Sequence, residues 1–196
     1  MSVERIPSIV LEGYHGISAV NLAAKHLADG KIFLTGEITD EVANTFVQEF
    51  LYLKEKGEPV TIYINTPGGS ISAGLIIYDL IQAATDLEIH MVCVGGALSM
   101  GAILLAGGQK GRRHILPHAQ VMLHEPRIAS GIVGSVTSIQ SLSESMIHTK
   151  KMMNEILLKH TGRSRKEIEK VTRSDCFMNA EQSVAFGICD DILHTI

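Results

Sequence analysis

Residues 60–106 read VTIYINTPGGSISAGLIIYDLIQAATDLEIHMVCVGGALSMGAILLA, and this stretch decides the fold. It contains two strand-turn-helix units in succession. Residues 60–64 alternate like a strand and 71–84 favour a helix, and 89–94 and 100–106 then repeat the pattern. Both turns are rich in glycine, which lets the backbone bend sharply and lets a ligand come close.

The same alternation begins further upstream. Residues 31–35 (KIFLT) predict a short buried strand, and residues 42–53 carry apolar side chains at helical spacing. Thr39 and Asp40 are candidate N-caps for that helix. Strands that alternate with helices are typical of a mostly parallel sheet covered by helices, so we predict an α/β fold.

Downstream of residue 106 the pattern changes. Residues 113–116 and 121–124 predict short strands, and residues 129–135 predict a flexible or edge-strand segment. A long helix is predicted at 136–160, and its methionine-containing apolar face is wider than one core seam requires. Such a face predicts packing against another subunit as well as against its own domain. The predicted closing elements are helices at 164–171 and 180–186 and a strand at 188–193.

Length and composition narrow the class of protein. A chain of 196 residues fits a single domain, 1–196, and a net charge of −4 argues against nucleic acid or an anionic membrane as partner. Three cysteines without metal-ligand spacing favour reduced thiols. The N-terminus lacks the pattern of a signal peptide, and no segment approaches the ~18 apolar residues that span a bilayer. We therefore expect a cytoplasmic protein.

Ser99 is a candidate nucleophile because it lies where an apolar strand passes into an apolar helix. In a parallel sheet, sites collect at the carboxyl ends of strands, so Ser99 and the Gly68-Gly69 turn should face one crevice. The backbone N–H groups of Gly69 and Met100 are candidate oxyanion donors. The alternative interpretation of these glycines is a tight turn that serves packing alone.

The base and its orienting carboxylate are less certain from the residues alone. Among nine histidines, His124 follows the apolar residues 121–123 and precedes Pro126, which ends regular pairing there. Asp175 is the candidate orienter, expected in a turn where Phe177 and Met178 would bury it. Taken separately, His124 is better interpreted as a structural histidine and Asp175 as a capping or turn aspartate. No histidine spacing supports a metal site.

Five segments together resemble the ClpP family of self-compartmentalised serine peptidases, over nearly the whole chain. In the order of the sequence they are Ile32–Leu34, Tyr63–Gly69, Ser99–Leu105, Val121–Pro126 and Asp175–Glu181. The resemblance implies that Ser99 is the nucleophile, His124 the general base and Asp175 its orienter. It likewise implies an oxyanion hole formed by the N–H groups of Gly69 and Met100.

The resemblance also implies an architecture and partners. The expected fold is crotonase-like, with residues 1–30 as N-terminal segment and first helix and a helical handle at about 125–160. Two seven-membered rings would stack through the handles, and an AAA+ Clp unfoldase would feed in polypeptide substrates. Extended peptides would pair beside Gly68 and along Gly131, Ile132 and Val133. No cofactor is expected, since ATP is used by the unfoldase.

Several residues depart from the family pattern, so the chain resembles a divergent paralogue. Arg173 and Ser174 replace an acidic–arginine pair of the ring–ring contact, and Thr61 and His114 replace aromatic residues that commonly line the unfoldase-docking pocket.

Three alternatives to an active serine peptidase remain open. They are a regulatory or poorly active ring subunit, a crotonase-type enzyme acting on acyl-CoA, and a Ser-Lys dyad peptidase that uses Lys110.

Overall fold

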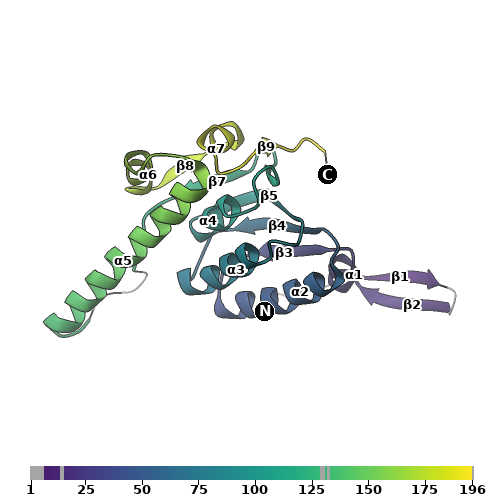
Figure 1. Ribbon diagram of the computed structural model, residues 1–196. Coiled ribbons are helices and arrows are strands. Elements are labelled where there is room, and N and C mark those ends of the chain that lie inside the picture. Colours follow the sequence, from purple (N-terminus) through teal and green to yellow (C-terminus); the bar gives the residue numbers. More distant parts are fainter. Residues whose placement is uncertain (1–6, 14–15, 129–130, 132, 196) are drawn as a thin grey trace.

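In the computed structural model, which describes residues 7–13, 16–128, 131 and 133–195, helices cover a mostly parallel sheet (Figure 1). The strands are β1 (Ser8–Gly13), β2 (Gly16–Asn21), β3 (Lys31–Thr35), β4 (Val60–Thr66), β5 (Ile89–Leu98), β6 (Arg113–Ile115), β7 (Gln120–Leu123), β8 (Cys176–Met178) and β9 (Asp191–Ile192). The helices are α1 (Leu22–Ala28), α2 (Asp40–Lys56), α3 (Ile71–Ala83), α4 (Met100–Ala106), α5 (Val136–Thr161), α6 (Arg165–Thr172) and α7 (Ala180–Phe186). The predicted α/β class is confirmed.

The strand order of the main sheet is β3-β4-β5-β6-β9, with every neighbouring pair parallel. β5 is longer than the predicted 89–94 and forks the sheet. Its residues 91–93 pair with β6, whereas residues 96–98 pair with β7. β8 then adds to β7 in the antiparallel direction. Two short strands, β6 and β7, therefore pair with successive parts of β5. As a result β7 and its partner β8 lie beside the turn that follows β5.

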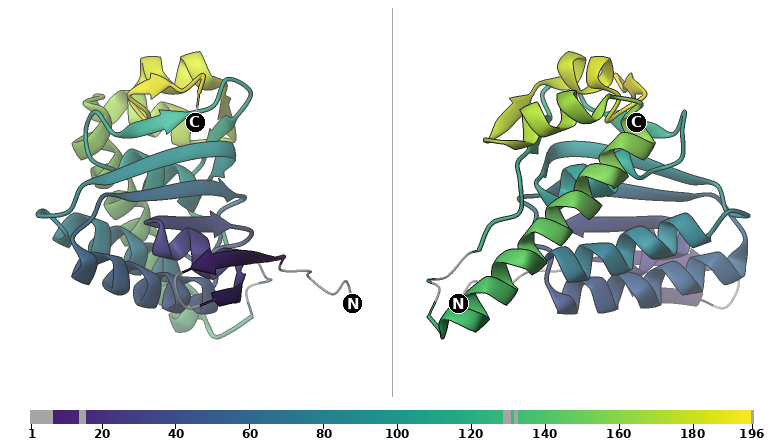
Figure 2. Two further views of the ribbon diagram at one scale, coloured as in Figure 1. Left: turned by 90° about the vertical axis from the view of Figure 1, so that its right-hand side faces the viewer. Right: turned by 60° about the vertical axis from the view of Figure 1, so that its left-hand side comes forward.

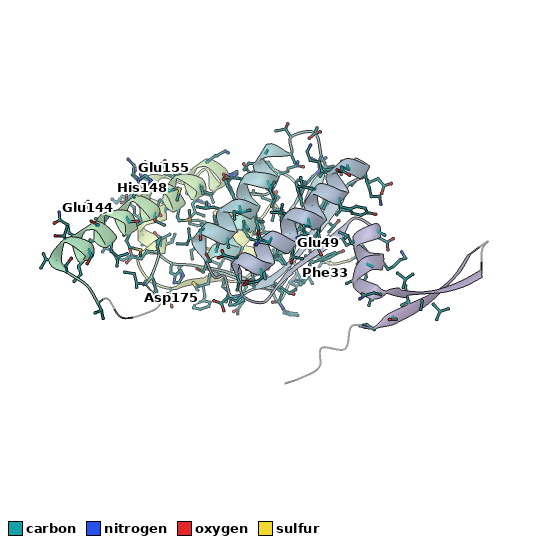
Figure 3. All side chains as sticks on the ribbon, turned by 90° about the horizontal axis from the view of Figure 1, so that it is seen from below. Phe33, Glu49, Glu144, His148, Glu155 and Asp175 are labelled. Carbon is teal, nitrogen blue, oxygen red and sulfur yellow. The ribbon has the colours of Figure 1, made fainter. Side chains whose placement is uncertain are left out.

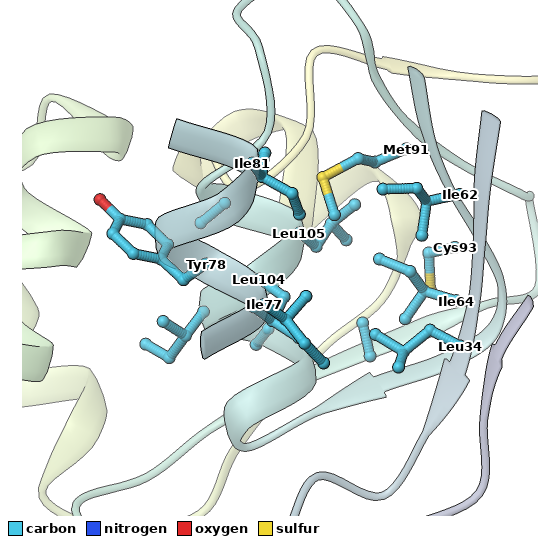
Figure 4. Packing of buried hydrophobic residues seen from close by; sticks show 14 of the residues in the cluster. Leu34, Ile62, Ile64, Ile77, Tyr78, Ile81, Met91, Cys93, Leu104 and Leu105 are labelled. Atoms are coloured by element: carbon cyan, nitrogen blue, oxygen red, sulfur yellow. The ribbon is translucent and has the colours of Figure 1, made fainter. Parts of the chain in front are cut away.

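The core lies between the sheet and the helices packed on it. Figure 4 shows Ile62 and Ile64 of β4 and Met91 of β5 facing Ile77 of α3 and Leu104 of α4. All five side chains are fully buried or nearly so. Burial of a branched aliphatic side chain of this size contributes roughly 1.5–3 kcal/mol, so the low aromatic content of the chain does not weaken this core.

Helix α5 projects from the body of the molecule, as expected for the handle (Figures 1 and 2). Ser135 caps its N-terminus through the N–H of Ser138, and Gly162 in the left-handed conformation ends it. Its buried residues all lie in the second half of the helix, between Met153 and Leu157. Large apolar side chains of the first half are exposed, namely Val136, Ile139, Leu142 and Ile147. The handle therefore presents an apolar surface that its own domain leaves uncovered.

One strand prediction was wrong, the edge-strand alternative for 129–135 was not borne out, and one hairpin was not predicted. The strand predicted at 188–193 shrinks to β9, because Ile188 donates its backbone N–H to Ser183 in the turn that ends α7. Within 129–135 the described residues, 131 and 133–135, form no strand. β1 and β2 form an antiparallel hairpin that the sequence did not predict and that projects from the sheet (Figure 1).

Candidate active site

Ser99 sits at the strained junction of β5 and α4. Its φ of 53° and ψ of −117° make it the one non-glycine residue with positive φ in the described part of the chain. This sparsely populated conformation costs a residue with a Cβ roughly 1–3 kcal/mol, so the surrounding structure must hold it. The N–H of Ser99 donates to the Met122 carbonyl of β7 at 2.8 Å. The turn thereby fixes where the hydroxyl points.

His124 reaches Ser99 because β7 pairs with the end of β5. Leu98 lies opposite Met122 in the parallel register, so His124 follows the strand directly beside the serine turn. Its Nε2 lies 2.7 Å from Ser99 Oγ, a hydrogen-bond distance suited to a base that removes the hydroxyl proton. The structure thus brings together two residues that the sequence singled out separately.

Asp175 lies next to His124 because Leu123 pairs with Cys176 in the antiparallel register of β7 and β8. Asp175 Oδ1 is 3.4 Å from His124 Nδ1, too far for a good hydrogen bond. His124 Nδ1 is buried and has no hydrogen-bond partner among the described residues. Arg127 instead donates to Asp175 Oδ1.

The expected burial of Asp175 was wrong. Its side chain is 42% exposed. Along the short strand β8, Phe177 also points outward and is exposed, whereas Met178 alone is buried. Side chains alternate between the faces of a strand, so two adjacent apolar residues cannot both cover the same neighbour. Figure 3 shows Asp175 at the handle end of the molecule, with Phe33 toward the hairpin end.

The turn after β4 brings backbone close to Ser99. A Cβ added at Gly68, where φ is +95°, would lie 2.7 Å from Ser99 Cβ, and one at Gly69, where φ is +151°, would lie 2.3 Å from the Ile38 carbonyl oxygen. Both positions therefore require glycine. The Gly68 N–H donates to Thr66 Oγ1 at 3.0 Å. Within the described residues, the N–H groups of Gly69 and Met100 donate no hydrogen bond.

A cavity of about 580 Å³ opens beside Ser99 and His124. Much of its wall is apolar, with side chains from α3, α4, β7 and the base of α5; these include Ile71, Met100, Ile103, Leu123, Met153 and Leu157. Asn154 also lines it and is only 5% exposed. The sequence analysis did not place Asn154 or Arg127 at the site, because their positions beside Ser99 and Asp175 depend on contacts between distant segments.

The remaining predicted residues lie elsewhere. Gly131 and Val133 are exposed and do not line the cavity, and Ile132 lies outside the described residues. Lys110 lies 3.6 Å from Asp190 and is absent from the cavity wall, which argues against a Ser-Lys dyad.

Among the described residues, no three His, Cys, Asp or Glu side chains are grouped so as to hold a metal ion. No helix in that part of the chain combines the length and hydropathy of a membrane span.

The parallel sheet, the projecting α5 and the cavity beside Ser99 define a mixed α/β protein with a hydrolase-like site. A family model described as Clp protease matches residues 15–195, nearly the whole chain. The chain belongs to the Clp protease family and is therefore a peptidase. Self-assembly and partnership with an unfoldase are general properties of that family.

Proposed function

We propose that this chain is a serine endopeptidase whose triad is Ser99, His124 and Asp175. The observation that carries the proposal is the 2.7 Å contact between His124 Nε2 and Ser99 Oγ on a strained strand-to-helix turn. A positive φ at a non-glycine residue persists only where the fold enforces it, and such strain concentrates at functional sites. An ordinary surface serine needs neither the strain nor the histidine.

The proposed reaction has two steps. Ser99 Oγ attacks the scissile carbonyl carbon while His124 Nε2 takes its proton, and the N–H groups of Gly69 and Met100 receive the oxyanion. His124 then protonates the leaving amine, which leaves an acyl-enzyme. A water molecule, deprotonated by His124, hydrolyses the ester and regenerates Ser99. Asp175 orients His124 and stabilises its protonated form, and none of these steps requires a cofactor.

The proposed substrates are unfolded polypeptides. The apolar wall of the cavity accepts an apolar side chain next to the scissile bond, and the glycine turn lets the substrate backbone approach Ser99 closely. The N–H of Gly68 already donates to Thr66 Oγ1 and so is not a candidate oxyanion donor. Gly68 instead aids substrate binding because it has no side chain to block the substrate backbone. Gly131, Ile132 and Val133 are proposed to pair with the extended substrate before cleavage.

The proposed assembly is two stacked heptameric rings in the cytoplasm, served by an AAA+ unfoldase that consumes the ATP. The exposed apolar side chains on the first half of α5 support a contact between subunits there. Closure of the sites inside such a chamber would limit the isolated peptidase to short peptides.

The test uses a fluorophosphonate probe and short fluorogenic peptides. The wild-type chain should be labelled and should cleave the peptides, and Ser99→Ala should abolish both. Ser8→Ala, which removes an exposed hydroxyl on β1, is the matched control and should leave both unchanged. Undiminished labelling or cleavage by Ser99→Ala would refute the assignment.

The second candidate is a poorly active or regulatory ring subunit. It is favoured by one observation: among the described residues Nδ1 of His124 has no hydrogen-bond partner, while Arg127 holds the neighbouring Asp175. A wild-type assembly that forms rings but lacks Ser99-dependent labelling would support this second function.

A further inference from the structure

Arg127 and His124 approach the same oxygen of Asp175. The guanidinium of Arg127 donates to Oδ1, and Nδ1 of His124 lies 3.4 Å from that atom without completing a hydrogen bond. His124 Nδ1 is otherwise buried and unpartnered within the described residues. A buried polar atom without a hydrogen-bond partner costs free energy, so a hydrogen bond from Nδ1 to this carboxylate would stabilise the imidazole.

Arginine is a strong competitor for a carboxylate. It stays positively charged at every physiological pH and presents several N–H donors. When it binds Asp175, it neutralises part of the negative charge that would otherwise stabilise a protonated His124. It also fixes the position of the carboxylate, which would otherwise be free to turn because its side chain is 42% exposed. Both effects oppose the role of Asp175 in the triad.

We propose that Arg127 is a positioning residue that holds Asp175 away from His124 and so restrains the activity of the Ser99 site. This inference rests on the proposed function and names a regulation of the same triad. Release of Arg127 lets the Asp175 carboxylate close on His124 Nδ1. The imidazole then gains its second hydrogen bond and becomes a better base for Ser99.

The restraint should be modest. The side chain of Arg127 is 56% exposed, and exposed ion pairs contribute little because water screens them. We therefore expect its loss to raise kcat/KM about two- to fivefold. High salt should weaken the same contact in the wild-type protein.

Other charged groups lie near His124 and Asp175. Glu125 pairs with Lys150, whose hydrogen bond and charge, with smaller contributions from the charges of Arg127 and Arg173, lower the pKa of Glu125. Glu37 also lines the cavity. Among these groups, Arg127 is the one that contacts the carboxylate of Asp175.

The experiment compares Arg127→Gln with the wild type in peptide hydrolysis. We expect kcat to rise about two- to fivefold with little change in KM. In 0.5 M salt the wild-type rate should approach that of the variant, whose own rate should change less.

Two matched variants complete the design. Arg127→Lys keeps the charge and should behave more like the wild type than Arg127→Gln does. Arg165→Gln removes an arginine of similar exposure, 52%, from its ion pair with Glu155 on the outer surface, and should leave the rate unchanged. An Arg127→Gln rate equal to or below that of the wild type would overturn the proposal, as would an effect confined to KM.

Failure of this inference is distinguishable from failure of the proposed function. If the wild type shows no Ser99-dependent labelling and Arg127→Gln shows none either, the restraint proposal and the peptidase assignment both fail. If labelling depends on Ser99 but proceeds at the same rate in the wild type and Arg127→Gln, the peptidase assignment stands and the restraint is refuted.

Discussion

Replacement of Gly69 by alanine tests the proposed oxyanion hole most directly. The φ of Gly69 is +151°, and an added Cβ would lie 2.3 Å from the carbonyl oxygen and 2.7 Å from the backbone nitrogen of Ile38. Real Cβ atoms do not approach backbone this closely, and backbone cannot rotate away as a flexible side chain can. The turn must therefore move, and the N–H of Gly69 moves with it.

The expected loss has two parts. Displacement of one oxyanion donor typically lowers kcat by about 10²- to 10³-fold. The strained backbone should cost a further 1–3 kcal/mol of unfolding free energy, roughly. Peptide hydrolysis measured per folded protein gives the first quantity, and urea unfolding gives the second. Normalisation to the folded fraction keeps the two effects separate.

Gly36→Ala is the control for backbone strain alone. Gly36 also has a positive φ, +75°, but an added Cβ there meets nothing within 4 Å. It should cost about 1 kcal/mol of stability and leave hydrolysis unchanged. A folded Gly69→Ala protein with wild-type kcat would refute the reasoning about the oxyanion hole.

Two further predictions concern stability and assembly. Asp190→Asn removes the counterion of Arg113, whose side chain is 1% exposed, and should cost about 3 kcal/mol in urea unfolding at pH 7. Burial raises the pKa of Asp190, but hydrogen bonds and charge from Arg113 outweigh it and lower that pKa to about 2, below the ordinary 3.8. The contribution of Asp190 to the free energy of unfolding is therefore present above about pH 4 and lost as the pH falls through about 2. The unfolding free energies of wild type and variant should converge in acid, and a difference that stays constant with pH would contradict this. Ile147→Glu places a charge on the exposed apolar face of α5 and should reduce the native mass of the assembly, whereas an unchanged mass would place the contact elsewhere.

Much of the fold was predictable because it depends on neighbours in the sequence. The helix at 100–106 and the N-cap at Thr39 match the structure. Periodicity reports which side chains an element buries, and capping residues report where its backbone bonds end. β9 was mispredicted for the same reason, since Ile188 and Cys189 are buried like strand residues although the backbone there closes a helix.

The sequence by itself determined the α/β alternation, the glycine turns and the choice of Ser99 and His124. Tertiary structure alone decided how the site fits together. The distance from His124 to Asp175 and the position of Arg127 depend on how β5, β7 and β8 pair. The contact of Arg127 with Asp175 joins residues 48 apart in the chain. Local sequence patterns determine which side chains are buried and where the backbone turns. The register of strand pairing, and the competition of Arg127 and His124 for Asp175 Oδ1, depend on contacts between segments that are distant in the sequence.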